Sequence, residues 1–76
     1  MKELLEYIAK SLVDYPADVV VTETENGNTT VLELKVNESD MGKVIGKQGR
    51  IAKSIRAVIK ATASRENKKA VVEIMQ

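Results

Sequence analysis

The segment Gly-Lys-Val-Ile-Gly-Lys-Gln-Gly-Arg-Ile, residues 42–51, places two glycines three positions apart between two predicted helices. Without Cβ atoms, Gly46 and Gly49 permit a tight turn and a close approach of a ligand to the backbone. The loop also presents free backbone N–H groups at the start of the second helix, where the helix dipole favours an anion. Lys47 adds a positive charge between the glycines. This chemistry fits a phosphodiester backbone.

Other interpretations of this segment differ in how well they fit. A plain helix–helix turn would also use Gly46 to end one helix and Gly49 to relax the next. A Walker phosphate loop is excluded, because it needs four residues between its glycines and a Ser or Thr after its Lys. Here Gly42 and Gly46 enclose three residues, and Gln48 follows Lys47. A dinucleotide-binding fingerprint is excluded as well, since no strand leads directly into the glycines. Apolar and basic residues on both sides of the loop favour a binding function over a plain turn.

The hydrophobic pattern before this segment predicts one helix and two strands. Apolar residues at helical spacing predict an amphipathic helix over residues 2–13. β-branched residues at 19–24 and a strict alternation over 30–37 predict two strands. The Asn-Gly dipeptide at 26–27 favours the left-handed dihedral angles of a tight hairpin turn, so we expect the two strands to pair antiparallel.

The pattern around and after the glycines predicts the rest of an α+β fold. We expect a short helix over 41–45 with Ser39 or Asp40 as its cap, a longer helix over 50–64, and a strand over 70–75. The order helix, strand, strand, short helix, long helix, strand predicts a three-stranded sheet with helices covering one face. The apolar side of the longer helix is expected in the core and comprises Ile51, Ile55, Val58 and Ile59.

Composition bounds the function classes. The 76 residues allow one small domain, 1–76, and 43% hydrophobic with 30% charged residues is a globular balance. The chain has no Cys and no His, and its serines have no candidate base, so we expect no catalytic residues, no metal site, no cofactor and no enzymatic activity. Neither a signal peptide nor a membrane segment is predicted, and we expect a cytoplasmic protein.

Charge is distributed unevenly along the chain. Residues 1–40 hold nine acidic and three basic side chains, whereas residues 41–76 hold two acidic and nine basic ones, and the chain as a whole carries +1. This asymmetry suggests a positive face with a polyanionic partner. Mutual neutralisation of the two halves across the fold would explain it equally well.

The sequence Val-Ile-Gly-Lys-Gln-Gly-Arg-Ile at 44–51, followed by Ile55, resembles the signature of a KH domain. The predicted element order resembles the prokaryotic, type II form of that domain, α-β-β-α-α-β. The length, the opening Met-Lys-Glu-Leu-Leu-Glu-Tyr-Ile and the segment 44–50 together resemble the small bacterial single-KH proteins of the KhpA (YlqC-like) family. The resemblance extends over essentially all 76 residues.

The resemblance implies binding of single-stranded RNA. In KH domains the Gly-x-x-Gly loop clamps the backbone of about four nucleotides. Carried over by position, the clamp would be Gly46, Lys47, Gln48 and Gly49, preceded on the short helix by Lys43, Val44 and Ile45 and extended by the positive side chains of Arg50 and Lys53. A role in post-transcriptional RNA processing, or one like that of an RNA chaperone, would follow.

The scarcity of aromatic residues sets limits on this binding. With two Tyr, no Phe and no Trp, the chain cannot stack bases extensively on exposed rings. We therefore expect modest affinity and low sequence selectivity, and help from a second KH unit through effective concentration. The resemblance also implies a second KH unit, supplied either by a homodimer or by a complex with a larger KH-containing protein of the Jag/KhpB type.

Two alternatives from other classes remain open at this stage. A basic helix after a glycine-containing turn is also typical of duplex-DNA-binding helix-turn-helix proteins. Against this, residues 41–45 are too few for a proper first helix, and the long helix offers few side chains that could contact bases. The second alternative is a KH-like protein–protein assembly module that binds no nucleic acid, although the intact glycines and Lys47 argue against it.

Overall fold

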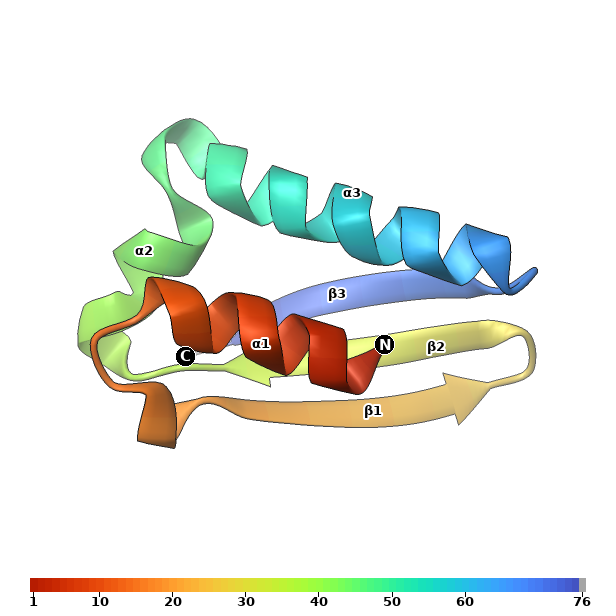
Figure 1. Cartoon of the computed structure of the whole chain (residues 1–76), viewed down its shortest axis with the longest axis horizontal. Helices are drawn as coiled ribbons and strands as arrows, with labels where there is room; N and C mark the ends of the chain where they lie inside the picture. Colours follow the sequence, from red (N-terminus) through yellow and green to blue (C-terminus); the bar gives the residue numbers. More distant parts are fainter. Residues whose placement is uncertain (76) are drawn as a thin grey trace.

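Helices lie on one face of a three-stranded sheet in the computed structural model, which describes residues 1–75 (Figure 1). The helices are α1 (Lys2–Leu12), α2 (Met41–Ile45) and α3 (Arg50–Arg65), and the strands are β1 (Val20–Asn26), β2 (Thr29–Lys35) and β3 (Lys69–Met75). α1 packs over β1 and α3 packs over β3. The predicted α+β class and the order α-β-β-α-α-β are confirmed.

The sheet has the order β1-β2-β3, with β2 in the centre. β1 and β2 form the predicted antiparallel hairpin, in which Val20 lies opposite Lys35 and Gly27 has a φ of +65° in the turn. β3 pairs parallel to β2, with Lys69 opposite Thr29. A parallel neighbour requires a long crossover, and α2, the glycine loop and α3 together form that crossover.

The core lies between the sheet and the helices. The largest completely buried apolar side chains come from every layer: Leu5, Leu32, Leu34, Val44 and Ile59. Along β2 the burial alternates, with Thr30, Leu32 and Leu34 inside, as the alternation of apolar residues predicted. None of the helices in residues 1–75 is long and apolar enough to cross a membrane.

One predicted core residue of α3 is wrong. Val58 is 46% exposed, because the helix turns Ala52, Ile55, Ile59 and Ala63 toward the sheet instead. Val58 precedes Ile59 by one residue and is therefore rotated about 100° from it around the helix axis. Two buried positions were missed because they hold alanine, and the sequence pattern was judged from larger side chains.

Candidate nucleic-acid interface

The loop between α2 and α3 is a tight turn with several left-handed residues. Positive φ angles occur at Gly46 (76°), Gln48 (59°) and Gly49 (74°). The N–H of Gly46 donates to the carbonyl of Gly42 (2.8 Å), and the N–H of Gly49 donates to the carbonyl of Gly46 (3.2 Å). The backbone therefore reverses within four residues and places Lys47 and Gln48, both exposed, at its tip.

The two glycines are needed for different reasons. A Cβ at Gly46 would lie 2.5 Å from Cγ1 and 2.8 Å from Cβ of Ile51, so the loop backbone packs directly on the first turn of α3. A Cβ at Gly49 would have no heavy atom of residues 1–75 within 4 Å apart from those of its chain neighbours. Gly46 is therefore required for close packing as well as for its dihedral angles, and Gly49 for its dihedral angle alone.

The structure brings most of the predicted site residues to the surface around this turn. Lys43, Ile45, Lys47, Gln48, Arg50 and Lys53 are exposed, and Gly46 and Gly49 are half-buried. Val44 differs, because its side chain is completely buried and anchors α2 in the core. A phosphate could therefore approach the exposed residues, whereas Val44 can act only through the position of α2.

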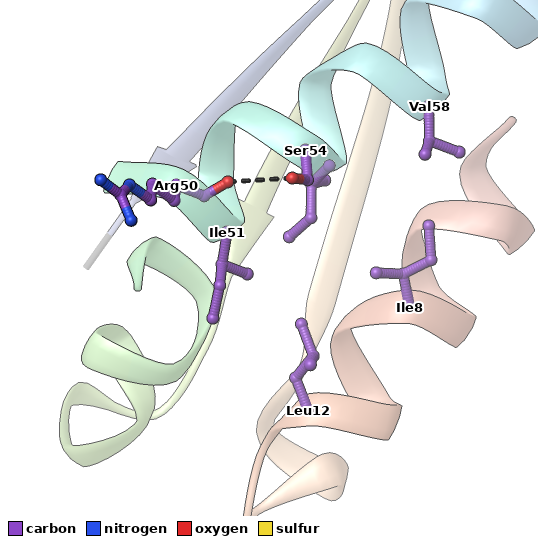
Figure 2. Close-up of a pocket in the computed structure, with 7 residues that line it drawn as sticks. Ile8, Leu12, Arg50, Ile51, Ser54 and Val58 are labelled. Atoms are coloured by element: carbon purple, nitrogen blue, oxygen red, sulfur yellow. Dashed lines mark hydrogen bonds between the residues drawn. The ribbon is translucent and has the colours of Figure 1, made fainter. Parts of the chain in front are cut away.

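The side chain of Arg50 stabilises the tip of the loop through Gln48. Its Nη2 donates to Oε1 of Gln48 at 3.1 Å, which helps to hold Gln48 in its left-handed conformation. Ser54 Oγ donates to the Arg50 carbonyl at 3.0 Å, one turn further along α3 (Figure 2). Within residues 1–75, no carboxylate lies within 4.0 Å of the charged groups of Lys47, Arg50 or Lys53. These three cations are available to an anionic ligand.

Lys43 has a different environment from the other cations. Its Nζ lies 2.7 Å from Oδ2 of Asp14 and 3.6 Å from Oδ1 of Asp40. The hydrogen bond to Asp14 is the largest cause that raises the pKa of Lys43, with partial desolvation opposing it. The charge of Lys43 is therefore already balanced by two carboxylates within the protein.

Two side chains at or near the site make long-range contacts that the sequence does not indicate. Arg56 donates through Nε to the carbonyl of Val72 at 3.2 Å, which joins α3 to the edge strand β3. Asp40 is completely buried. It occupies the N-cap position of α2, as one of the two predicted candidates, but its side chain makes no capping hydrogen bond there. Asn37 caps the preceding turn at Glu38–Asp40, accepting from the N–H of Ser39.

Residues 1–75 contain no group of three or more His, Cys, Asp or Glu side chains that could hold a metal ion. The features that stand out are the exposed glycine loop, the unpaired cations and the two-helix crossover between parallel strands. Together with the order α-β-β-α-α-β, they define a KH domain of type II.

Comparison with known sequences places the chain within one family of such domains. The family model for the KhpA/KhpB KH domain matches residues 2–74, so the chain belongs to this family. It is similar to the RNA-binding protein KhpA of Clostridium perfringens, with 67% identity over 99% of this chain and 100% of the relative. The RNA-binding protein KhpA of Chlamydia trachomatis is 49% identical over 100% of this chain and 97% of the relative.

Solved structures support the fold. The chain superposes on part of the protein Era from Aquifex aeolicus, bound to GDP and aluminium fluoride, with a TM-score of 0.65 and 22% identity. A second Era structure, in complex with a nucleotide and with nucleotides 1506–1542 of 16S ribosomal RNA, gives a TM-score of 0.59 and 23% identity. Each match covers 96% of this chain but only 28% of the Era chain.

Proposed function

We propose that this protein is a non-enzymatic binder of single-stranded RNA, in which residues 46–49 clamp the backbone of about four nucleotides. The observation that carries the proposal is the exposed turn of three left-handed residues, with Lys47 and Gln48 at its tip. The relatives named RNA-binding protein KhpA support RNA as the ligand. The protein would bind RNA in the bacterial cytoplasm.

The electrostatics around the turn favour phosphate as the group recognised. Lys47, Arg50 and Lys53 are exposed cations without a carboxylate of residues 1–75 within 4.0 Å. Backbone contacts fix the position of a nucleic acid but carry no sequence information. Ile45, 37% exposed beside the loop, offers an apolar surface to a base. Binding should therefore be salt-dependent and weakly selective, as suits an accessory of RNA processing or an RNA chaperone.

The double variant Lys47→Asp/Gln48→Asp is expected to abolish RNA binding while leaving the fold intact. Both side chains are exposed, and Asp tolerates the left-handed conformation of residue 48. Purified protein would be titrated into a labelled, mixed-sequence single-stranded RNA at several salt concentrations. Wild-type affinity should fall with salt, because binding releases counterions from the phosphates and this release is less favourable at high salt. Circular dichroism would verify the fold of the variant.

A matched control is available at the opposite end of α3. Asn67→Asp/Lys68→Asp makes the same change in charge, and Asn67 is the other non-glycine residue with positive φ (58°) in the described chain. This control should bind RNA as the wild type does. Equal binding by the loop variant and the wild type, or no binding by either, would favour the assembly-module function. A preference for duplex DNA would favour the helix-turn-helix alternative.

We further propose that the protein acts together with a second KH unit, either another copy or a larger protein of the Jag/KhpB type. One KH domain holds only about four nucleotides, and a linked second domain raises affinity through effective concentration. The family model covers both KhpA and KhpB.

An apolar groove between α1 and α3 supports pairing of two copies (Figure 2). Ile8 and Leu12 of α1 face Ile51 and Val58 of α3 across it. The exposed residues of α3 beside Val58 are small and uncharged, namely Ser54, Ala57 and Ala61, so a second helix could pack closely here.

Val58→Asp is expected to halve the mass measured by light scattering, because a charge would be buried in the paired groove. Val20→Asp is the matched control, since Val20 is a similarly exposed valine (53%, against 46% for Val58) on β1, away from this groove. Dissociation by Val20→Asp alone would assign the contact to the sheet. A wild-type protein that is monomeric at every concentration tested would overturn the homodimer.

A further inference from the structure

The carboxylate of Asp40 joins the end of α1 to the start of α2. Its Oδ1 accepts the N–H of Asp14 at 3.1 Å, and its Oδ2 accepts the N–H of Tyr15 at 3.0 Å. Lys43 Nζ, one turn further along α2, lies 3.6 Å from Oδ1. The Asp40 side chain is completely buried, whereas Lys43 approaches it from the exposed side.

α2 is a short helix with few buried side chains. It is five residues long, and Val44 is its one buried residue. A helix of this length is not stable alone. The turn that follows, Lys47–Gly49, has no buried residue at all. Val44 in the core, Met41 at its edge and the packing of the Gly46 backbone on Ile51 hold α2 on one side. The contacts of Asp40 add an attachment to the turn after α1, so they contribute to the orientation of α2 and to the path of the chain into Gly46.

A buried carboxylate adds little net stability to a fold. Removing a charge from water is unfavourable unless hydrogen bonds and a counter-charge compensate it. Hydrogen bonds from backbone N–H groups to a carboxylate are, however, strong and directional. Two such bonds, to the consecutive residues Asp14 and Tyr15, fix both the distance and the angle between the turn after α1 and α2. Packing of Val44 by itself would not fix that angle.

We propose that Asp40 is a positioning residue for the RNA clamp. It orients α2 so that the chain enters Gly46 at the angle that the clamp requires, and it engages Lys43 as part of the same support. Lys43 then acts within the protein instead of contacting phosphate, in contrast to Lys47. The inference rests on the proposed function, because it concerns the geometry of that same loop.

The test compares Asp40→Asn with Asp14→Asn. Asp40→Asn keeps the size of the side chain but replaces one acceptor by a donor, and it removes the charge facing Lys43. Asp14→Asn weakens the 2.7 Å contact to Lys43 but leaves both backbone hydrogen bonds of Asp40 in place. We expect Asp40→Asn to bind single-stranded RNA roughly tenfold more weakly, and Asp14→Asn to bind nearly as the wild type does.

Amide hydrogen exchange separates positioning from general stability. In Asp40→Asn the amides of residues 44–50 should exchange faster, while those of Leu32 and Ile59 in the core keep their protection. A purely structural role would lower protection throughout and leave the RNA affinity of the folded fraction unchanged. If Asp40→Asn does not fold, Asp40→Glu, which keeps the charge but displaces it by one methylene, should show the same loss of affinity.

The outcomes distinguish the two proposals. A wild-type protein that binds no RNA overturns the proposed function and this inference with it. If the wild type binds and Lys47→Asp/Gln48→Asp does not, while Asp40→Asn binds like the wild type with unchanged loop exchange, only the positioning role is overturned.

Discussion

Gly46→Ala is expected to destabilise the folded state by about 3 kcal/mol. The new methyl group would lie 2.5 Å from Cγ1 of Ile51, and the residue would have to keep a φ of 76° with a ψ of 177°. That combination is almost exclusive to glycine. Cβ of Ile51, only 2.8 Å away, is fixed to the α3 backbone, so the clash cannot be relieved by a rotamer change. Urea denaturation followed by circular dichroism would measure the loss.

Gly49→Ala is the control for this prediction. Gly49 has a similar φ of 74°, but apart from its chain neighbours a Cβ there has no heavy atom of residues 1–75 within 4 Å. The expected loss is therefore only the left-handed penalty, about 1 kcal/mol. Equal losses in the two variants would show that packing against Ile51 does not constrain the loop.

Ile59→Ala is expected to lower the free energy of unfolding by about 3 to 4 kcal/mol. Ile59 is completely buried between α3 and the sheet, and the substitution both removes apolar contacts and leaves a cavity. Domains of this size have total stabilities near the lower end of about 5–15 kcal/mol. The variant should therefore be close to unfolding, with a much lower urea midpoint and an unchanged slope.

The neighbouring substitution Val58→Ala should change stability by about 0.5 kcal/mol or less. Val58 is 46% exposed, and alanine is the better helix former. The free energies of unfolding of the two variants should be compared at low protein concentration, where pairing of two chains adds little to the apparent stability. A loss from Val58→Ala comparable with that from Ile59→Ala would mean that Val58 is covered in the folded monomer.

Local sequence patterns were sufficient for the elements and for the loop. The alternation around Leu32 and Leu34, the Asn-Gly turn before β2 and the helical spacing of Ile55 and Ile59 each act within a few residues. Gly46 and Gly49 belong to the same class, because their dihedral angles are a local property of the chain.

Features that depend on distant residues were not predicted. The partners of Asp40 lie 25 and 26 positions before it, and nothing in the local sequence indicates them. The hydrogen bond of Arg56 to Val72 depends on where β3 pairs. The exposure of Val58 depends on which side of α3 faces the sheet, and the apolar spacing alone did not specify this to within one residue.

The parallel pairing of β2 with β3 also has a consequence for the order of folding. The hairpin of β1 and β2 joins neighbours in sequence and can close early, whereas β3 must wait for the whole segment 36–68 to be laid across the sheet. The glycine loop lies inside that segment, and α3, on which Gly46 packs, rests on β3. A nascent chain that still lacks its last strand therefore has the residues of the glycine loop but not the surface that holds them in place.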